Sequence, residues 1–225
     1  MSTTPVRAVE LSAKFAYAHS LFRKPTPEQH AWLLSGECQS IWSELAAESE
    51  DCSSPLAVPA ACEDFAERYI ATFDVGTPAP PVPLIESHYN KREPIPRILH
   101  ENILFYRQFG LQLRDSALEN ADHLRHQLEF TRHLLAYHAR LQESDTTAVS
   151  RQVTHALRDF VTRHLLSWLP EAAVGAAGAP LPMAERALRL TTSLTRQVIA
   201  HTACNEEALR SVLTRAPLRE TSSSL

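Results

Sequence analysis

Apolar side chains recur along most of this chain at the spacing of an amphipathic α-helix. Between Val9 and Arg23 they follow one another at intervals of four, three and four positions, which places Leu11, Phe15, Ala18 and Phe22 on one face. The same spacing predicts further helices near 27–35, 41–45, 65–73, 97–109, 123–143, 147–168, 182–201 and 206–215. Thr26 is expected to cap the helix near 27–35, with Pro27 in its first turn and Gln29 completing a capping box. No stretch alternates apolar and polar residues for long, so we expect no β-sheet.

Three segments interrupt this pattern. Half of the residues in 74–83 are proline or glycine, which predicts an extended loop. We also expect a flexible loop of small residues at 170–181 and a disordered tail at 217–225. The chain therefore predicts one all-α domain over 1–216, a bundle-like fold of about eight to ten helices. The long proline-rich loop 74–86 lies in its middle.

Composition narrows the class of protein. A net charge of −4 argues against a general nucleic-acid binder, which needs a dense basic face. The N-terminus lacks an apolar signal core and no segment approaches the ~20 apolar residues of a membrane span, so we expect a cytoplasmic protein. The cysteines lack CxxC spacing and predict free thiols: Cys38, Cys52, Cys62 and Cys204.

No motif typical of an enzyme appears. The chain has neither Gly-x-Ser-x-Gly, nor a glycine-rich phosphate loop, nor His-Glu-x-x-His, and it has only five glycines. We therefore expect a binding protein rather than an enzyme, with no cofactor of its own.

The polar face of the helix predicted at 123–143 offers an alternative, a helical metal-binding protein. Two carboxylates and two imidazoles share this face, namely Asp122, His126, Glu129 and His133. Such residues can bind a metal in a helical bundle, but these sites take matching ligands from a second helix, commonly as Glu-x-x-His. No second motif occurs, so we expect a solvated face without metal.

Four short blocks follow one another along the middle of the chain. They are Ser87-His88-Tyr89 after the proline-rich loop, Phe105 to Leu111, Glu119-Asn120-Ala121-Asp122-His123, and His164-Leu165-Leu166-Ser167-Trp168. Gly110 is expected to end its helix. Asp122 either caps the helix that follows it or faces a binding groove. His164 and Trp168 are expected to be buried scaffold.

In this order the blocks resemble the TorD/DmsD/NarJ family of cytoplasmic chaperones for bacterial molybdenum-cofactor oxidoreductases. The resemblance covers roughly 84–170 and departs from the family at Asn120, where the family has proline. It implies a chaperone that binds the twin-arginine signal peptide of a catalytic subunit and assists folding, cofactor insertion and export proofreading. The client-binding residues that it implies are Glu86, Ser87, Tyr89, Phe105, Phe109, Gly110, Glu119, Asp122 and His123.

The resemblance also implies how the peptide is held. A basic segment followed by an apolar stretch needs an apolar groove with an acidic edge. The segments 87–89 and 105–110 would supply the walls, and Glu86, Glu119 and Asp122 the acidic edge. The partners would be the leader and the catalytic subunit, with no nucleic acid and no membrane span, and the protein would be a monomer or homodimer. A generic helical adaptor for a partner helix remains the other alternative.

Overall fold

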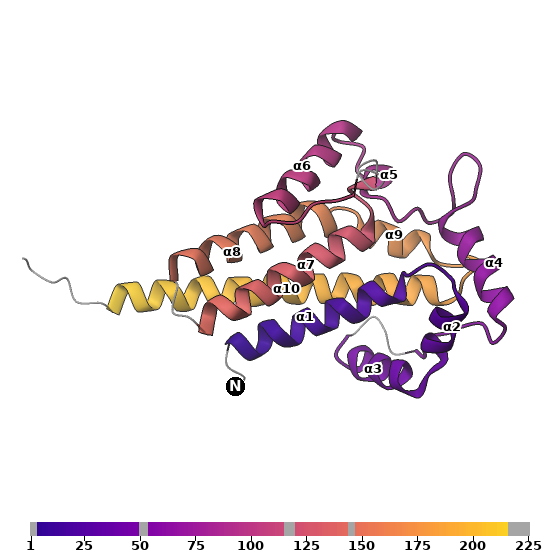
Figure 1. Ribbon diagram of the computed structural model, residues 1–225, viewed down its shortest axis with the longest axis horizontal. Coiled ribbons are helices and arrows are strands. Elements are labelled where there is room, and N and C mark those ends of the chain that lie inside the picture. The colour runs from indigo at the N-terminus through magenta and orange to yellow at the C-terminus, as the bar shows by residue number, and fades with distance from the viewer. Residues whose placement is uncertain (1–3, 50–53, 115–119, 144–146, 216–225) are drawn as a thin grey trace, which may run out of the picture.

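The computed structural model describes residues 4–49, 54–114, 120–143 and 147–215, and Figure 1 shows their arrangement. The helices are α1 (Thr4–Leu21), α2 (Pro27–Leu34), α3 (Gly36–Ala47), α4 (Cys62–Phe73), α5 (Glu86–Tyr89), α6 (Ile95–Gln108), α7 (Leu124–Glu143), α8 (Thr147–Phe160), the π-helical turn η2 (Val161–Leu165), α9 (Leu169–Gly175) and α10 (Met183–Arg215). Within these ranges no strand forms, and the nearest feature is an isolated antiparallel bridge between Ile85 and His123. The prediction of an all-α, single-domain fold is confirmed.

Long helices form the centre of the molecule. Helix α1 packs against α7 and α10, α7 packs against α8, and α10 packs against α8 and α9. Figure 1 shows α1, α7, α8 and α10 lying lengthwise beside one another, with α2, α3 and α4 gathered towards one end. Helix α10 has 33 residues and so extends for roughly 50 Å. Across the described ranges, no helix is long and apolar enough to cross a membrane.

The apolar stripe predicted near the N-terminus is the buried face of α1. Leu11, Phe15 and Ala18 are buried, as is Phe22 just after the helix. The Phe22 ring meets the Phe73 ring edge-on, with centroids 6.3 Å apart. Each large apolar side chain that is buried in this way contributes about 1.5–3 kcal/mol, so this face anchors α1 in the core.

Local capping explains where α2 and α3 begin. The Thr26 hydroxyl accepts from the Gln29 backbone N–H at 3.2 Å, and Pro27 occupies the first turn of α2, as the sequence predicts. The Gln29 side chain does not return to Thr26 but donates to the Ser20 carbonyl oxygen at 2.7 Å. Ser35 ends α2 and caps α3 by accepting from the Cys38 N–H.

Three expectations about the second half of the chain are wrong. The segment 170–181 is not a flexible loop throughout, because α9 occupies its first part and buries Ala172 and Ala173 against α10. The helices predicted at 182–201 and 206–215 are one continuous helix, since no glycine or proline separates them. The helix predicted over 147–168 changes to π geometry at Val161. The predicted tail, 217–225, lies outside the described ranges.

Candidate functional site

The proline-rich loop and the start of α7 meet in a short antiparallel pairing. The Leu124 N–H donates to the Leu84 carbonyl oxygen at 2.9 Å, and the Glu86 N–H donates to the Asp122 carbonyl oxygen at 3.2 Å. The loop reaches this position from α4, where the Val82 N–H donates to the Thr72 carbonyl oxygen. Two of the blocks identified in the sequence therefore lie side by side.

Asp122 caps α5 rather than its own helix. Its Oδ2 accepts from the Ser87 backbone N–H at 2.8 Å, in the first turn of α5. The carboxylate is 1% exposed, and burial raises its pKa although the hydrogen bonds from Ser87 act in the opposite direction. The expectation that Asp122 caps α7 is wrong, and its carboxylate does not lie on the protein surface.

His123 is the residue that caps α7. Its Nδ1 accepts from the Arg125 backbone N–H at 3.1 Å, so the ring carries its proton on Nε2. Burial, followed by the positive charges of His126, Arg125, His19 and Lys24, lowers its pKa to about 4. The ring is therefore neutral at physiological pH.

Glu86 lies at the centre of a buried polar cluster. Its Oε2 accepts from Gln127 Nε2 at 2.7 Å and from Asn102 Nδ2 at 3.2 Å. Nδ1 of His164 lies 3.2 and 3.1 Å from the two carboxylate oxygens. These side chains are at most 2% exposed. Because a buried carboxylate requires such partners, this cluster fixes α5 against α6, α7 and η2.

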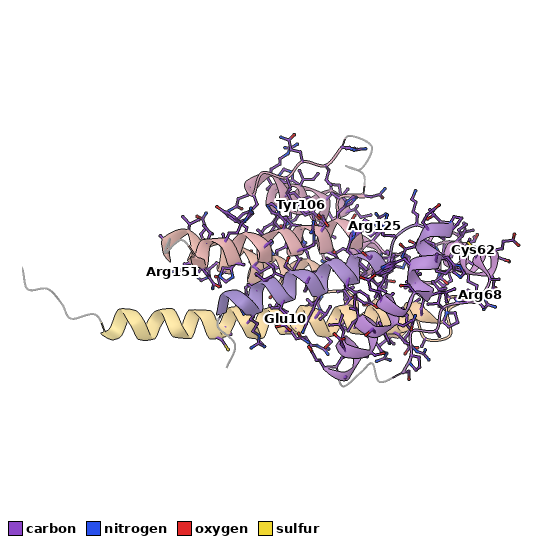
Figure 2. The ribbon with its side chains drawn as sticks, turned by 60° about the horizontal axis from the view of Figure 1, so that its bottom comes forward. Glu10, Cys62, Arg68, Tyr106, Arg125 and Arg151 are labelled. Carbon is purple, nitrogen blue, oxygen red and sulfur yellow. The ribbon has the colours of Figure 1, made fainter. Side chains whose placement is uncertain are left out.

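Two aromatic side chains complete the cluster. The Tyr106 hydroxyl donates to the Ala121 carbonyl oxygen at 2.8 Å and lies 3.2 Å from Asn102 Oδ1. Burial, together with the negative charges of Glu86 and Asp122, raises the Tyr106 pKa well above its ordinary value. Trp168 Nε1 donates to the His164 carbonyl oxygen at 2.6 Å. Tyr106, a residue of α6, is labelled in Figure 2.

The π-helical turn positions His164. In this turn the Leu166 N–H bonds to the Val161 carbonyl oxygen, five residues back. Relative to a regular α-helix, the wider turn changes the direction of the residues that follow. His164 and Trp168 are both buried there, which confirms the expectation that they are scaffold.

A groove of about 690 Å³ lies beside the pairing of the proline-rich loop with α7. Its cations are Lys24, Lys91 and Arg125, whereas Asp74 is the only carboxylate among the described residues that line it. Figure 2 shows Arg125 near the end of α1 that leads to α2. Its complete lining is Lys24, Phe73, Asp74, Ala79, Pro80, Pro83, Leu84, Ile85, Ser87, His88, Lys91, Ile95, Asn120, His123, Arg125 and His126.

The structure brings only part of the predicted client-binding set to this groove. Ser87 and His123 line it. Glu86 and Asp122 lie beneath the surface, where each is 1% exposed, so they do not form the expected acidic edge. Glu119 lies outside the described ranges.

The other predicted residues lie elsewhere. The Tyr89 ring stacks on Trp168, with centroids 5.4 Å apart. Phe105 and Phe109 join the aromatic core between α6, α7 and α8, and Phe105 also lines a separate hollow beside α8. Gly110 ends α6 with a φ of 77°, and Leu111 N–H closes the turn on the Tyr106 carbonyl oxygen, as the sequence predicts.

Sequence reasoning missed the residues that hold Glu86 and those that give the groove its charge. Asn102 shares the buried face of α6 with Ile98 and Tyr106, four positions away on either side. Gln127 is buried beside Leu128 on α7. A polar residue on an apolar helix face is a signal that could have revealed both. No comparable pattern marks Lys24, Lys91 or Arg125.

The side chains of the metal-binding alternative do not converge. Asp122 accepts from Ser87, and Glu129 pairs with Arg132 at 2.5 Å. The His126 ring lies 6.0 Å from that of His123. Over the ranges that the structure describes, no group of three or more His, Cys, Asp or Glu residues is arranged to hold a metal ion.

Comparison with known proteins gives consistent matches. The model of the nitrate reductase delta subunit family matches residues 34–174. The perchlorate reductase assembly chaperone protein of Dechloromonas aromatica (strain RCB) is 32% identical over 122 residues, 54% of each chain. The selenate reductase assembly chaperone protein of Thauera selenatis is 36% identical over 110 residues, 48% of this chain and 55% of that one. The chlorate reductase assembly chaperone protein of Ideonella dechloratans is 32% identical over 110 residues, with the same coverage.

The chain thus spans about half the length of the curated relatives it matches. No solved structure matches it significantly. The matched family confirms the resemblance drawn from the four blocks.

Proposed function

The chain belongs to the nitrate reductase delta subunit family, and we propose that it is an assembly chaperone for the catalytic subunit of a molybdenum-containing oxidoreductase. The observation that carries this proposal is the match to three reductase assembly chaperones. The matched family model covers residues 34–174, which include all of the groove's described lining except Lys24. Such a protein acts by binding and releasing its client, with no covalent step. It would act in the cytoplasm, before the client is exported.

We propose that the client contacts the groove between the proline-rich loop and α7. Its lining combines apolar side chains with hydrogen-bonding groups, as a peptide site requires. Ile95 is 55% exposed there and so offers apolar surface to a ligand. Of the predicted client-binding residues, Ser87 and His123 line this groove, one on each side of the antiparallel pairing.

The proposal includes the twin-arginine leader of the catalytic subunit. Its apolar stretch would cover Ile85 and Ile95, and one arginine would pair with Asp74, which is exposed at the groove. Glu86 and Asp122 would support this surface from below, since both carboxylates already have partners in the interior. Bound in this way, the chaperone would mask the export signal until the catalytic subunit has folded around its cofactor.

The test is a titration of the full chain with the leader of the catalytic subunit encoded beside it. Saturable binding is expected, and it should weaken when both leader arginines become glutamine. Asp74→Asn should weaken binding by about three- to ten-fold, as loss of one partly screened charge pair would. The matched control is Glu67→Gln, which changes an exposed carboxylate on α4 outside the groove.

Client maturation gives the second measurement. Cells that lack the chaperone should accumulate a catalytic subunit without its cofactor. Re-expression of the chain should restore the cofactor-containing subunit. If the folded chain binds no leader and its absence leaves maturation unchanged, the proposed function is wrong.

A further inference from the structure

The groove beside α7 carries an excess of positive charge that the leader does not explain. Lys24 comes from the α1–α2 connection, Lys91 from the α5–α6 connection, and Arg125 from the first turn of α7. The exposed Lys91 side chain is held in place, because its Nζ donates to the Ser87 carbonyl oxygen at 3.2 Å. Against these three cations the described lining offers only Asp74.

Arg125 is the strongest sign that a partner is missing. Its Nε is buried and has no hydrogen-bond partner within the described ranges. A guanidinium N–H that is removed from water without an acceptor is costly, and a carboxylate or phosphate oxygen offsets that cost best. The nearby Asp122 does not supply this acceptor: its Oδ2 accepts from the Ser87 N–H, and its Oδ1, which is also buried without a partner, forms no hydrogen bond with Arg125 Nε.

The positive charge of the groove also affects the imidazoles around it. Burial lowers the pKa of His88, His123 and His126, and neighbouring cations lower each of them further. Since Nδ1 of His123 is used within α7, its protonated Nε2 is the atom left to donate to a ligand. The groove therefore presents N–H donors and positive charge together.

The apolar part of the lining indicates what kind of anion fits. Phe73, Ile85 and Ile95 stand beside prolines 80 and 83, so the groove is not a purely polar phosphate site. A peptide that carries both acidic and apolar side chains matches both halves of the surface.

We propose that this groove receives an acidic, apolar-containing segment of the client polypeptide, with its carboxylates on Lys24, Lys91 and Arg125. The inference rests on the proposed function only for the identity of the client. Under the proposed function the leader's arginine contacts Asp74, so the three cations are left to a different, acidic part of the client.

The test uses the full chain and short labelled peptides. One peptide alternates glutamate with leucine, and its two counterparts replace glutamate by glutamine or by lysine. The variant Lys24→Gln/Lys91→Gln removes two groove charges, and the matched control Arg107→Gln/Arg151→Gln removes two exposed charges from α6 and α8. Figure 2 shows Arg151 towards the left of the view, well away from Arg125, which lies nearer the middle of the molecule.

We expect the glutamate peptide to bind saturably and the glutamine peptide to bind at least ~10-fold more weakly. The groove variant should lose ~10-fold in affinity for the glutamate peptide, and the control should be unchanged. Affinity should also fall as salt is raised, because the contacts are near the surface.

Three results would overturn the inference: tighter binding of the lysine peptide, equal losses in the groove variant and the control, or binding of pyrophosphate alone. The last would identify a small-anion site. The outcome is separate from that of the proposed function. The chain could bind the glutamate peptide as expected while cells that lack the chain still mature the client normally. That result would refute the chaperone proposal and leave the site for an acidic segment in place.

Discussion

Replacing Glu86 by glutamine tests whether the buried cluster holds α5 in place. In the native protein, three donors approach the carboxylate: Asn102 Nδ2, Gln127 Nε2 and His164 Nδ1. A glutamine amide keeps one oxygen, and its NH₂ group must then face one of these donors. The nearly isosteric change therefore keeps the volume of the site, removes the negative charge and leaves one oxygen instead of two to accept hydrogen bonds.

The magnitude follows from the number of lost contacts. Hydrogen bonds to a charged group contribute about 1.5–3 kcal/mol, and a buried donor left without an acceptor costs about 1–3 kcal/mol. We expect Glu86→Gln to lower the free energy of unfolding by about 3 kcal/mol. For a domain of this size that corresponds to roughly 6–12 °C in the melting temperature.

The assay is urea unfolding followed by circular dichroism, with Glu93→Gln as the control. Glu93 forms an exposed ion pair with Arg97 at 3.0 Å, so its replacement should change the unfolding free energy by less than ~0.5 kcal/mol. A double-mutant cycle with His164→Gln should show coupling of at least ~1 kcal/mol. A loss below ~1 kcal/mol for Glu86→Gln, or additive effects in the cycle, would refute the view that this cluster stabilises the site.

Four further predictions concern Asp122, His123 and Gly110. Asp122→Ala should cost about 2 kcal/mol of unfolding free energy, because the buried Ser87 N–H loses its acceptor, whereas Asp122→Asn keeps an acceptor and should cost less. Because folding raises the pKa of Asp122 above 3.8, ionisation of this carboxyl group opposes folding. In urea unfolding, the wild type should therefore lose stability as pH rises from 3.8 through the pKa of the folded state, and Asp122→Asn should not show this loss. Because the pKa of His123 falls from 6.5 to about 4 on folding, the wild type should lose stability as pH falls between these values. His123→Asn retains an acceptor for the Arg125 N–H and should lose less stability over this range. Parallel plots of stability against pH for the two proteins would contradict this prediction. Gly110→Ala should lower stability by about 1 kcal/mol in thermal unfolding, because the φ of Gly110 is positive. Gly36→Ala, which also has open space at its Cβ, should not lower stability. Equal effects of the two substitutions would disprove the role of the positive φ.

The features that sequence predicted correctly depend on local rules. The buried stripe of α1, the Thr26 cap with Pro27, and the glycine end of α6 at Gly110 each involve residues within a few positions. The four blocks also predicted the family, which the matched family model confirms. Local spacing could not predict α9, because its alanines are helical through packing against α10.

The site was harder to predict because its contacts are distant in sequence. Glu86 takes its partners from positions 16, 41 and 78 residues away, so its burial could not be foreseen from the 84–89 segment. The Asp122 carboxylate likewise caps a helix 35 residues earlier. The sequence placed both side chains at a client surface, whereas the fold buries them and gives them hydrogen-bond donors in the interior. The basic lining arises where two connections meet the first turn of α7, and no single segment carries it.

The dependence of α5 on Asp122 has a consequence for the order in which the protein folds. A four-residue helix cannot persist alone, and the first turn of this one takes its acceptor from the start of α7. We therefore expect the central helices to dock before this wall of the groove exists, so the wall is among the last features to form. A partly folded chain would expose apolar helix faces but would lack the groove. If the groove is the client site, as proposed, only a chain that has completed its own folding can bind the client there.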